Sequence, residues 1–167
     1  AAAAQADRTL AEAWQSRRAY PLVVTQGDGN LGVKGKNFEM LFSIAGAGPA
    51  SLKANGTEWL WRAPRPAFWR ASTDNDRGCG FPLRAAAWMA ADVFVTYSGM
   101  KVLEAGPDCV KVQFQFGIPT VPGASAELVY TVEAQGALRV DAVYHGVAGA
   151  PELPCFGVKF ETFGPVT

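Results

Sequence analysis

From residue 22 onward, apolar and polar side chains alternate in short runs that are separated by turn residues. The clearest run places Val110, Val112, Phe114 and Phe116 on one side, with a lysine and two glutamines between them. Alternation with a period of two residues is typical of a β-strand with one buried face. Comparable runs predict strands at residues 22–25, 31–36, 38–43, 51–54, 58–61, 94–104, 109–116, 126–133, 138–144 and 156–163.

Glycine, proline, asparagine and aspartate separate these runs. The segment at residues 27–30, with the sequence GDGN, predicts a turn, and the pair Asn55-Gly56 predicts a tight hairpin because both residues tolerate positive φ angles. Residues 45–49 predict a loop. Many short strands joined by frequent turns predict an antiparallel all-β sandwich or barrel.

Two segments depart from the alternating pattern and predict helices. Residues 82–91 have an apolar side and begin with Pro82, which is tolerated in the first turn of a helix. Residues 7–20 repeat Leu10 and Trp14 at helical spacing and end before a proline. We therefore expect one short helix in the body of the domain and a second segment of helix before it.

Length and charge narrow the class of protein. A chain of 167 residues is long enough for one domain with a buried core. Lysine and arginine number 15, as do aspartate and glutamate, so the basic surplus that phosphate binding requires is missing and we expect no nucleic-acid partner. No apolar run approaches the roughly 20 residues needed to cross a bilayer, so we expect no membrane partner.

The number and spacing of the cysteines, and the composition of residues 1–4, indicate the cellular compartment. Cys79, Cys109 and Cys155 lack metal-ligand spacing, and their odd number predicts free thiols. Residues 1–4 are alanines without the basic start of a secretory signal. We expect a cytoplasmic protein, although a mature exported chain would have the same composition.

The densest cluster of aromatic and charged side chains lies at residues 64–78. Within it, residues 67–78, with the sequence AFWRASTDNDRG, resemble the signature of the C-terminal domain, or small chain, of multi-domain β-galactosidases of glycoside hydrolase family 2. Residues 37–60 and 153–161 resemble two further segments of that domain, and Trp88 falls where the family carries a helical tryptophan. The chain departs from the family pattern at two positions, where Ser72 replaces a proline and Cys155 replaces an arginine.

The resemblance implies a β-supersandwich like that of galactose mutarotase, formed by residues 21–167. Residues 1–20 would be a tail or the end of a preceding immunoglobulin-like domain, in which case the segment around Trp14 is a strand. The family's later C-terminal segments are not found before residue 167, so we expect a sandwich that is incomplete at its C-terminus. An exposed sheet edge would then favour self-association.

The resemblance also implies a function, as an accessory domain of a β-galactosidase that hydrolyses terminal β-galactosides. In the family this domain packs against the catalytic (β/α)8 barrel, and the loop at residues 78–82 lies beside the galactoside. Both catalytic carboxylates belong to the barrel, so we expect no catalytic residue here and no hydrolysis by this chain alone. We also expect no cofactor, because the magnesium and sodium that the family commonly uses lie in other domains.

The candidate residues for a wall of the sugar site are Arg70, Asp74, Asn75, Asp76 and Gly78. A retaining glycosidase needs two carboxylates about 5–5.5 Å apart, and on an extended segment Asp74 and Asp76 would share a face with α-carbons roughly 6–7 Å apart. However, carboxylates in such turns usually accept hydrogen bonds from nearby backbone N–H groups. We therefore favour a structural turn, with Arg70 paired to Asp74 or Asp76 instead of binding sugar hydroxyls. The spacing of a calcium loop is missing, so we predict no metal site.

Two other functions remain open. A stand-alone carbohydrate-binding module would stack sugars on Trp59, Trp61, Phe68 or Trp69, although a sandwich more often buries such residues in its core or in a domain interface. An aldose 1-epimerase would need a histidine acid and a glutamate base in one cleft. His145 is the only histidine, and we expect it to be a satisfied surface or turn residue.

Overall fold

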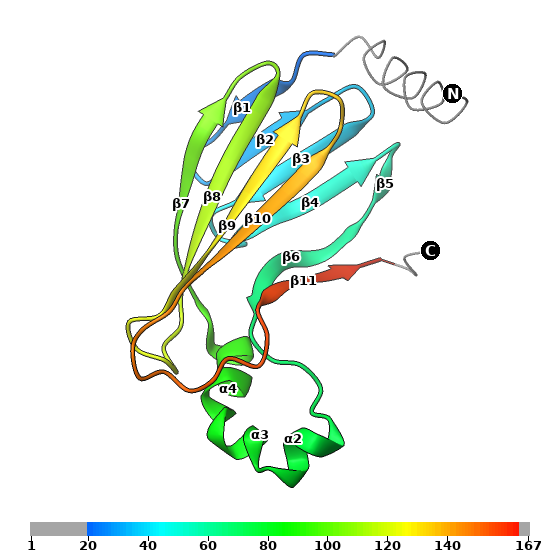
Figure 1. The fold of residues 1–167 in the computed structure, drawn as a ribbon. Coiled ribbons are helices and arrows are strands. Elements are labelled where there is room, and N and C mark those ends of the chain that lie inside the picture. Colours follow the sequence, from blue (N-terminus) through cyan, green and yellow to red (C-terminus); the bar gives the residue numbers. More distant parts are fainter. Residues whose placement is uncertain (1–19, 164–167) are drawn as a thin grey trace, which may run out of the picture.

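The computed structural model describes residues 20–163, so the helix predicted at residues 7–20, like the alternative strand, lies outside the described residues apart from Tyr20. The described chain is almost entirely β, with antiparallel strand pairs and three short helices at one end (Figure 1). The predicted antiparallel all-β sandwich is confirmed.

Two sheets and a ribbon make up the sandwich. The five-stranded sheet has the order β1-β2-β3-β4-β5: β1 (Val23–Gln26), β2 (Asn30–Lys34), β3 (Phe38–Ser43), β4 (Gly48–Ala54) and β5 (Thr57–Glu58). The four-stranded sheet has the order β10-β9-β8-β7: β7 (Thr96–Ala105), β8 (Cys109–Gly117), β9 (Ser125–Glu133) and β10 (Leu138–His145). A two-stranded ribbon pairs β6 (Leu60–Ala67) with β11 (Gly157–Thr162), and β6 leads from β5 toward the helices (Figure 1).

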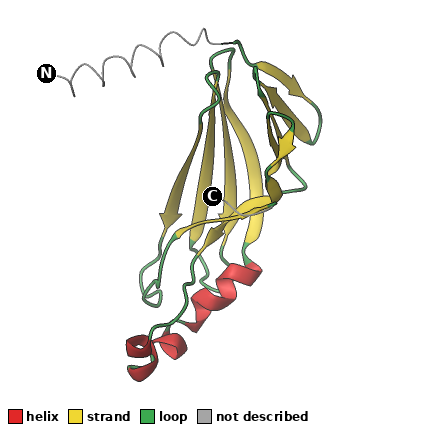
Figure 2. Cartoon of the chain, turned by 90° about the vertical axis from the view of Figure 1, so that its right-hand side faces the viewer, coloured by secondary structure: helices red, strands yellow, loops and turns green. Residues whose placement is uncertain are grey.

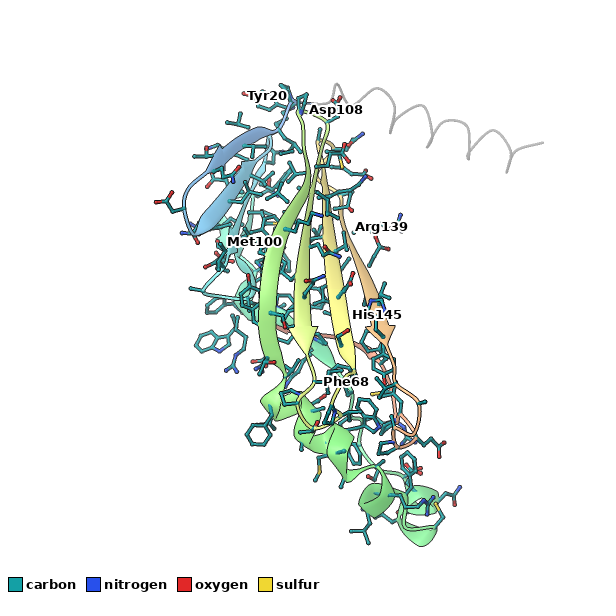
Figure 3. All side chains as sticks on the ribbon, turned by 90° about the vertical axis from the view of Figure 1, so that its left-hand side faces the viewer. Tyr20, Phe68, Met100, Asp108, Arg139 and His145 are labelled. Atoms are coloured by element: carbon teal, nitrogen blue, oxygen red, sulfur yellow. The ribbon has the colours of Figure 1, made fainter. Side chains whose placement is uncertain are left out.

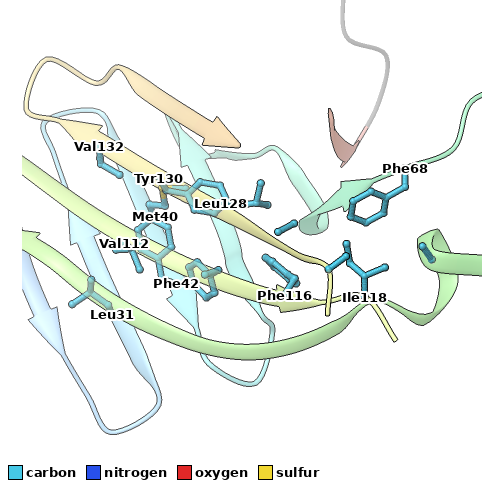
Figure 4. Packing of buried hydrophobic residues seen from close by; sticks show 14 of the residues in the cluster. Leu31, Met40, Phe42, Phe68, Val112, Phe116, Ile118, Leu128, Tyr130 and Val132 are labelled. Atoms are coloured by element: carbon cyan, nitrogen blue, oxygen red, sulfur yellow. The ribbon is translucent and has the colours of Figure 1, made fainter. Parts of the chain in front are cut away.

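The core lies between the inner faces of the two sheets (Figure 4). The predicted inward face of β8 is confirmed, because its four alternating apolar side chains are all buried: Val110, Val112, Phe114 and Phe116. The ring of Phe114 lies 6.1 Å from that of Phe42 on β3 and 5.8 Å from that of Tyr130 on β9. These rings join the two sheets at the centre of the sandwich.

The predicted hairpin at Asn55-Gly56 is confirmed and shows why the sequence turns there. Asn55 has a φ angle of 50° and Gly56 one of 80°, the left-handed conformation that this pair adopts most easily. The turn sets the register of β4 against β5, with Lys53 opposite Glu58.

The single strand predicted at residues 58–61 is instead two strands that meet at Trp59. The Glu58 carboxylate explains the break, because its Oε1 atom accepts hydrogen bonds from the backbone N–H groups of Leu52, Trp59 and Leu60. The chain therefore changes direction there, and β6 continues to Ala67 as one strand of the two-stranded ribbon. Such an edge strand tolerates its two prolines.

The three helices lie beyond one end of the sheets (Figure 2). They are α2 (Asp74–Gly78), α3 (Phe81–Arg84) and α4 (Ala86–Phe94). The single helix predicted at residues 82–91 is wrong in its bounds, because the chain leaves helical geometry at Ala85, with φ −100° and ψ 11°, and then continues to Phe94. Ala85 is buried, so α3 ends against the core before α4 begins.

Helix α4 is apolar on both sides. Trp88 and Ala91 are buried, whereas Met89, Val93 and Phe94 are exposed on the opposite side. A helix that is apolar all round usually occupies a buried position. The exposed side of α4 is therefore a surface that another polypeptide could cover.

Candidate functional site

The signature segment begins with a buried aromatic side chain, Phe68, at the junction between the sheets and the helices. Its ring centroid lies 5.7 Å from that of Trp88 on α4, 6.3 Å from that of Tyr144 on β10 and 5.8 Å from that of Phe156. Phe68 has no exposed surface, so the predicted core role of this residue is confirmed. It fixes the start of the segment relative to both the helices and the four-stranded sheet.

Two long-range hydrogen bonds hold the same junction. The backbone N–H of Phe68 donates to Oδ1 of Asp92 at 2.5 Å, and the indole Nε1 of Trp88 donates to the carbonyl oxygen of Pro151 at 3.0 Å. The first ties the segment to α4, and the second ties α4 to the loop that precedes β11. Sequence analysis missed Asp92, because no local pattern relates it to a residue 24 positions earlier.

After Phe68 the chain emerges at the surface, where Arg70 and Asp76 form a two-point ion pair. Nη1 of Arg70 lies 2.6 Å from Oδ2 of Asp76, and Nη2 lies 3.2 Å from Oδ1. The prediction that Arg70 pairs with one of the two aspartates is confirmed, with Asp76 as the partner. Bidentate pairing of this kind fixes the orientation of both side chains.

Asp76 also completes an N-terminal cap for α2. Its Oδ2 accepts a hydrogen bond from the backbone N–H of Thr73 at 2.8 Å, while Thr73 Oγ1 accepts one from the Asp76 N–H at 3.2 Å. The Arg70 guanidinium, and then the Thr73 N–H, hold the pKa of the Asp76 carboxyl well below its usual range. The prediction that these carboxylates accept from backbone N–H groups is confirmed for Asp76. The Thr-x-x-Asp spacing of a capping box could have revealed Thr73, which was missed.

The extended geometry that would place the Asp74 and Asp76 carboxylates on one face is not found, because the segment is helical, and the structural role favoured for the pair is the one the structure supports. Side chains two positions apart do not face each other on a helix. Asp74 pairs instead with Arg77, at 2.8 Å between Oδ1 and Nη2, and its carboxylate is almost fully exposed. Each aspartate therefore has its own arginine, and the two do not share a reacting centre.

The remaining predicted residues, Asn75 and Gly78, are exposed on the same short helix. The carbonyl oxygen of Asn75 accepts a hydrogen bond from the Cys79 N–H at 3.1 Å, which closes the end of α2. A β-carbon built at Gly78 would meet no other atom, so this position faces open space. Gly80 follows with a φ angle of 69° and reverses the chain into α3.

The cysteines around this segment differ in exposure. Cys79 is exposed, whereas Cys155, which stands where the family has an arginine, is partly buried. Burial, together with the charge of Asp92, raises the pKa of the Cys155 thiol, and Arg70 opposes this rise. A raised pKa disfavours the reactive thiolate, so Cys155 is a poor nucleophile. All three cysteines have free thiols, as predicted.

Trp59, just before the ribbon, and Trp61 on β6 lie at the surface and not in the core. Trp61 is 59% exposed and meets the ring of Phe163 edge-on at a centroid distance of 4.8 Å. Trp59 is also exposed and lines an apolar groove of about 200 Å³ that runs between β3, β4 and the β9–β10 hairpin. A core position is therefore wrong for these two residues, and the alternative, a position in a domain interface, stays a prediction. Trp69 packs partly buried against the core.

His145 is the last residue of β10, where the sequence predicted a position just after the strand. Its Nε2 lies 3.2 Å from Oε1 of Glu127 on β9, and Gln113 on β8 donates to the other oxygen of that carboxylate at 2.6 Å. The pair lies on the outer side of the sheet (Figure 3). This is the satisfied surface histidine that was predicted, and it does not line the groove described above.

Within residues 20–163, no three or more histidine, cysteine or acidic side chains are grouped so that they could hold a metal ion. The same part of the chain has no helix with the length and apolar character needed to cross a membrane.

The fold and this segment define an antiparallel β-sandwich domain with a rigid, ion-paired surface turn at one end. The model of the β-galactosidase small chain family matches residues 34–164, which is most of the sequence. The chain therefore belongs to the β-galactosidase small chain family, as the motif at residues 67–78 indicated.

The curated relatives of the chain are β-galactosidases or their small subunits, which agrees with the family assignment. Over 165 aligned residues the chain is 41% identical to the β-galactosidase small subunit of Latilactobacillus sakei, covering 87% of this chain and 52% of the relative. It is 37% identical to the β-galactosidases of Clostridium acetobutylicum and Streptococcus thermophilus, covering 83% and 84% of this chain but only 15% and 14% of those proteins. The chain thus spans about half of a small subunit and a small part of the longer β-galactosidases.

Proposed function

We propose that this chain is an accessory domain of a β-galactosidase, which packs on the catalytic (β/α)8 barrel and completes the binding site for a terminal β-galactoside. The parent reaction would be hydrolysis of that galactoside by carboxylates of the barrel. The chain would contribute a wall and a loop at residues 78–82 and no reacting group.

The rigid surface turn at Arg70 and Asp76 is the observation that carries this proposal. The capping box and the two-point ion pair fix the start of α2 relative to Arg70 at the end of the sandwich, just before the loop at residues 78–82. Asp76 is fully engaged in these contacts, which suits a structural support and not an acid or a nucleophile. The exposed apolar side of α4, next to this turn in the chain, supplies a surface suited to a partner domain.

The way in which this domain occurs in the relatives also supports the proposal. In Latilactobacillus sakei the matching sequence belongs to a protein named as a small subunit, and in Clostridium acetobutylicum it lies within one longer β-galactosidase. A domain that occurs both as a separate subunit and as part of a longer chain fits a role in which it contacts the rest of the enzyme.

Complementation tests this proposal. The full chain would be co-expressed with the catalytic chain that accompanies the Latilactobacillus sakei small subunit, and hydrolysis of a nitrophenyl β-galactoside would be measured. We expect hydrolysis above that of either chain alone, a loss with Asp76→Asn, and little change with Asp74→Asn, whose carboxylate is exposed. Hydrolysis by the purified chain alone that disappears with Asp74→Asn would overturn the accessory role.

A stand-alone carbohydrate-binding module is a second candidate, favoured by one observation. The exposed indole of Trp61 is held by Phe163 and lies next in sequence to Arg62, whose Nε is 2.9 Å from Oε2 of Glu161. An exposed aromatic face beside hydrogen-bonding groups suits a sugar ring. Calorimetric titration of the chain with galactose or lactose separates the candidates, since a binding module would release heat that Trp61→Ala removes.

A further inference from the structure

The loop at residues 78–82 is anchored at its two ends by different contacts. Helix α2, which precedes it, has no buried residue and depends on the ion pair at its start for its position. Phe81 in α3 is buried in the core cluster and holds the other end. Between these anchors lie Cys79, which is exposed, and Gly80, which is half-buried. Burial therefore does not fix the turn between α2 and α3.

Backbone hydrogen bonds hold this turn only weakly. Gly80 has a φ angle of 69°, and a glycine keeps wide conformational freedom because no β-carbon restricts it. Its N–H donates to the carbonyl oxygen of Arg77 at 3.2 Å, and its own carbonyl oxygen accepts from the N–H groups of Leu83 and Arg84 at 3.3 and 3.4 Å. These distances lie at or beyond the long end of the usual range for such bonds, about 2.7–3.2 Å.

The side chain of Arg84 adds a contact across the turn. Its Nη1 donates to the carbonyl oxygen of Cys79, and its Nη2 lies 4.0 Å from the Cys79 sulfur. A β-carbon built at Gly80 would lie 3.9 Å from the same Nη1, so the guanidinium covers the glycine. Arg84 is the last residue of α3, which Phe81 and Ala85 attach to the core. The guanidinium thus connects the end of α2 to the core.

We propose that Arg84 is a positioning residue for the loop at residues 78–82, and that it thereby sets the wall that this loop gives to the galactoside site. The second part rests on the function proposed above. Arginine suits the task, because its side chain can reach the last carbonyl oxygens of a helix and its planar guanidinium holds its donors in fixed directions. Arg84 acts through the loop and touches no reacting atom.

Two arginines then fix α2 from its two ends. Arg70 holds the start of the helix through the carboxylate of Asp76, and Arg84 holds its end through Cys79. Arg77 lies between these contacts, but it pairs with Asp74 inside α2 itself. Within residues 20–163 the Arg77 side chain therefore connects α2 to no other element, which makes it the matched control for Arg84.

Limited proteolysis of the full chain tests the first part of the proposal. Trypsin cleaves after Arg77, at the start of the loop, and its rate follows the population in which the backbone there is locally open. We expect Arg84→Ala to speed this cleavage by about threefold or more, because the turn loses its side-chain contact. Arg84→Lys keeps a donor on a long side chain and should restore most of the resistance.

Two controls separate local opening from a general loss of stability. Arg139→Ala, at an exposed arginine on β10, should leave cleavage after Arg77 unchanged. Urea denaturation should give nearly the same midpoint for Arg84→Ala and the unaltered chain, since Arg84 is exposed. A rate of cleavage after Arg77 that Arg84→Ala leaves unchanged overturns the proposal.

Steady-state kinetics of the complemented enzyme test the second part. We expect Arg84→Ala to raise KM for the nitrophenyl β-galactoside by about threefold or more and to change kcat less, because only molecules with an ordered loop present the complete site. Arg84→Lys should recover most of this loss, and Arg77→Ala should leave both constants unchanged. A fall in kcat at unchanged KM contradicts a residue that acts by positioning the loop.

Failure of this inference and failure of the proposed function give different results. Faster tryptic cleavage in Arg84→Ala together with an unchanged KM overturns the role of Arg84 at the sugar site and leaves the accessory function standing. An unaltered chain that adds no hydrolysis to the catalytic chain overturns the accessory function and, with it, the second part of the proposal. The rate of cleavage after Arg77 then decides whether Arg84 holds the loop.

Discussion

The backbone N–H of Phe68 donates to the carboxylate of Asp92, and this bond joins the start of the signature segment to the last turn of α4. Phe68 is buried, so its N–H has little access to water as an alternative acceptor. The bond also accounts for the single charged residue on an otherwise apolar helix, since Asp92 serves the neighbouring backbone.

Replacing Asp92 by alanine should lower the free energy of unfolding by about 1–3 kcal/mol, because a buried donor loses its acceptor. Asp92→Asn keeps a carbonyl oxygen in place and should lower it less. Urea denaturation measures both. Glu152→Ala, at an exposed carboxylate, is the control, and an Asp92→Ala effect no larger than that of the control would show that this bond contributes nothing.

Phe68→Ala should lower the free energy of unfolding by about 3–5 kcal/mol, because it removes the ring that packs against three other aromatic side chains. Phe160→Ala removes the same atoms from a half-exposed position on the ribbon and should have a much smaller effect. Chemical denaturation of the two variants side by side makes the comparison, and equal losses would contradict the central position of Phe68.

Tyr130→Phe should leave the stability unchanged or raise it by about 1 kcal/mol, because the buried hydroxyl has no hydrogen-bond partner within the described chain. Burial raises the pKa of this phenol, so the folded protein favours its neutral form. The resulting stability is present below the ordinary tyrosine pKa and is lost as the pH rises above it. Thermal unfolding checks the first expectation, and a clear loss of stability in Tyr130→Phe would show that the hydroxyl is bonded.

The carboxyl of Asp76 should titrate well below the ordinary range in an NMR titration, because its lowered pKa depends first on Arg70. Its contribution to stability is present above the unfolded-state pKa, about 3.9, and declines as the pH falls below that value. Arg70→Ala should raise the midpoint of Asp76, whereas Arg77→Ala, which removes the partner of Asp74, should not. An unchanged midpoint in Arg70→Ala would contradict the ion pair.

The sequence predicted the strands well because their signal is local. The run at residues 38–43 has the bounds of β3, and the alternation in residues 109–116 separates the buried side of β8 from its polar side. In both cases the pattern of a few neighbouring side chains is enough, since a strand exposes its faces in strict alternation.

The signature segment was harder to predict, for two physical reasons. Threonine and aspartate favour both turns and helix caps, so Thr73 and Asp76 indicate a turn as readily as the start of α2. The contacts that fix the segment, from Phe68 to Asp92 and from Trp88 to Pro151, join residues far apart in sequence. Only the folded chain brings them together, so no local pattern contains them.

The burial of Trp88 gives this domain a built-in optical reporter. Of the tryptophans in residues 20–163, Trp88 alone is fully buried, while Trp59 and Trp61 are exposed and accessible to a water-soluble quencher. Among the tryptophans of residues 20–163, emission that survives acrylamide quenching therefore comes from Trp88, at the junction between α4 and the loop at Pro151, with a smaller share from the partly buried Trp69. A red shift of that emission would signal that the helical end has detached from the sheets, while far-ultraviolet circular dichroism still reports an intact sandwich.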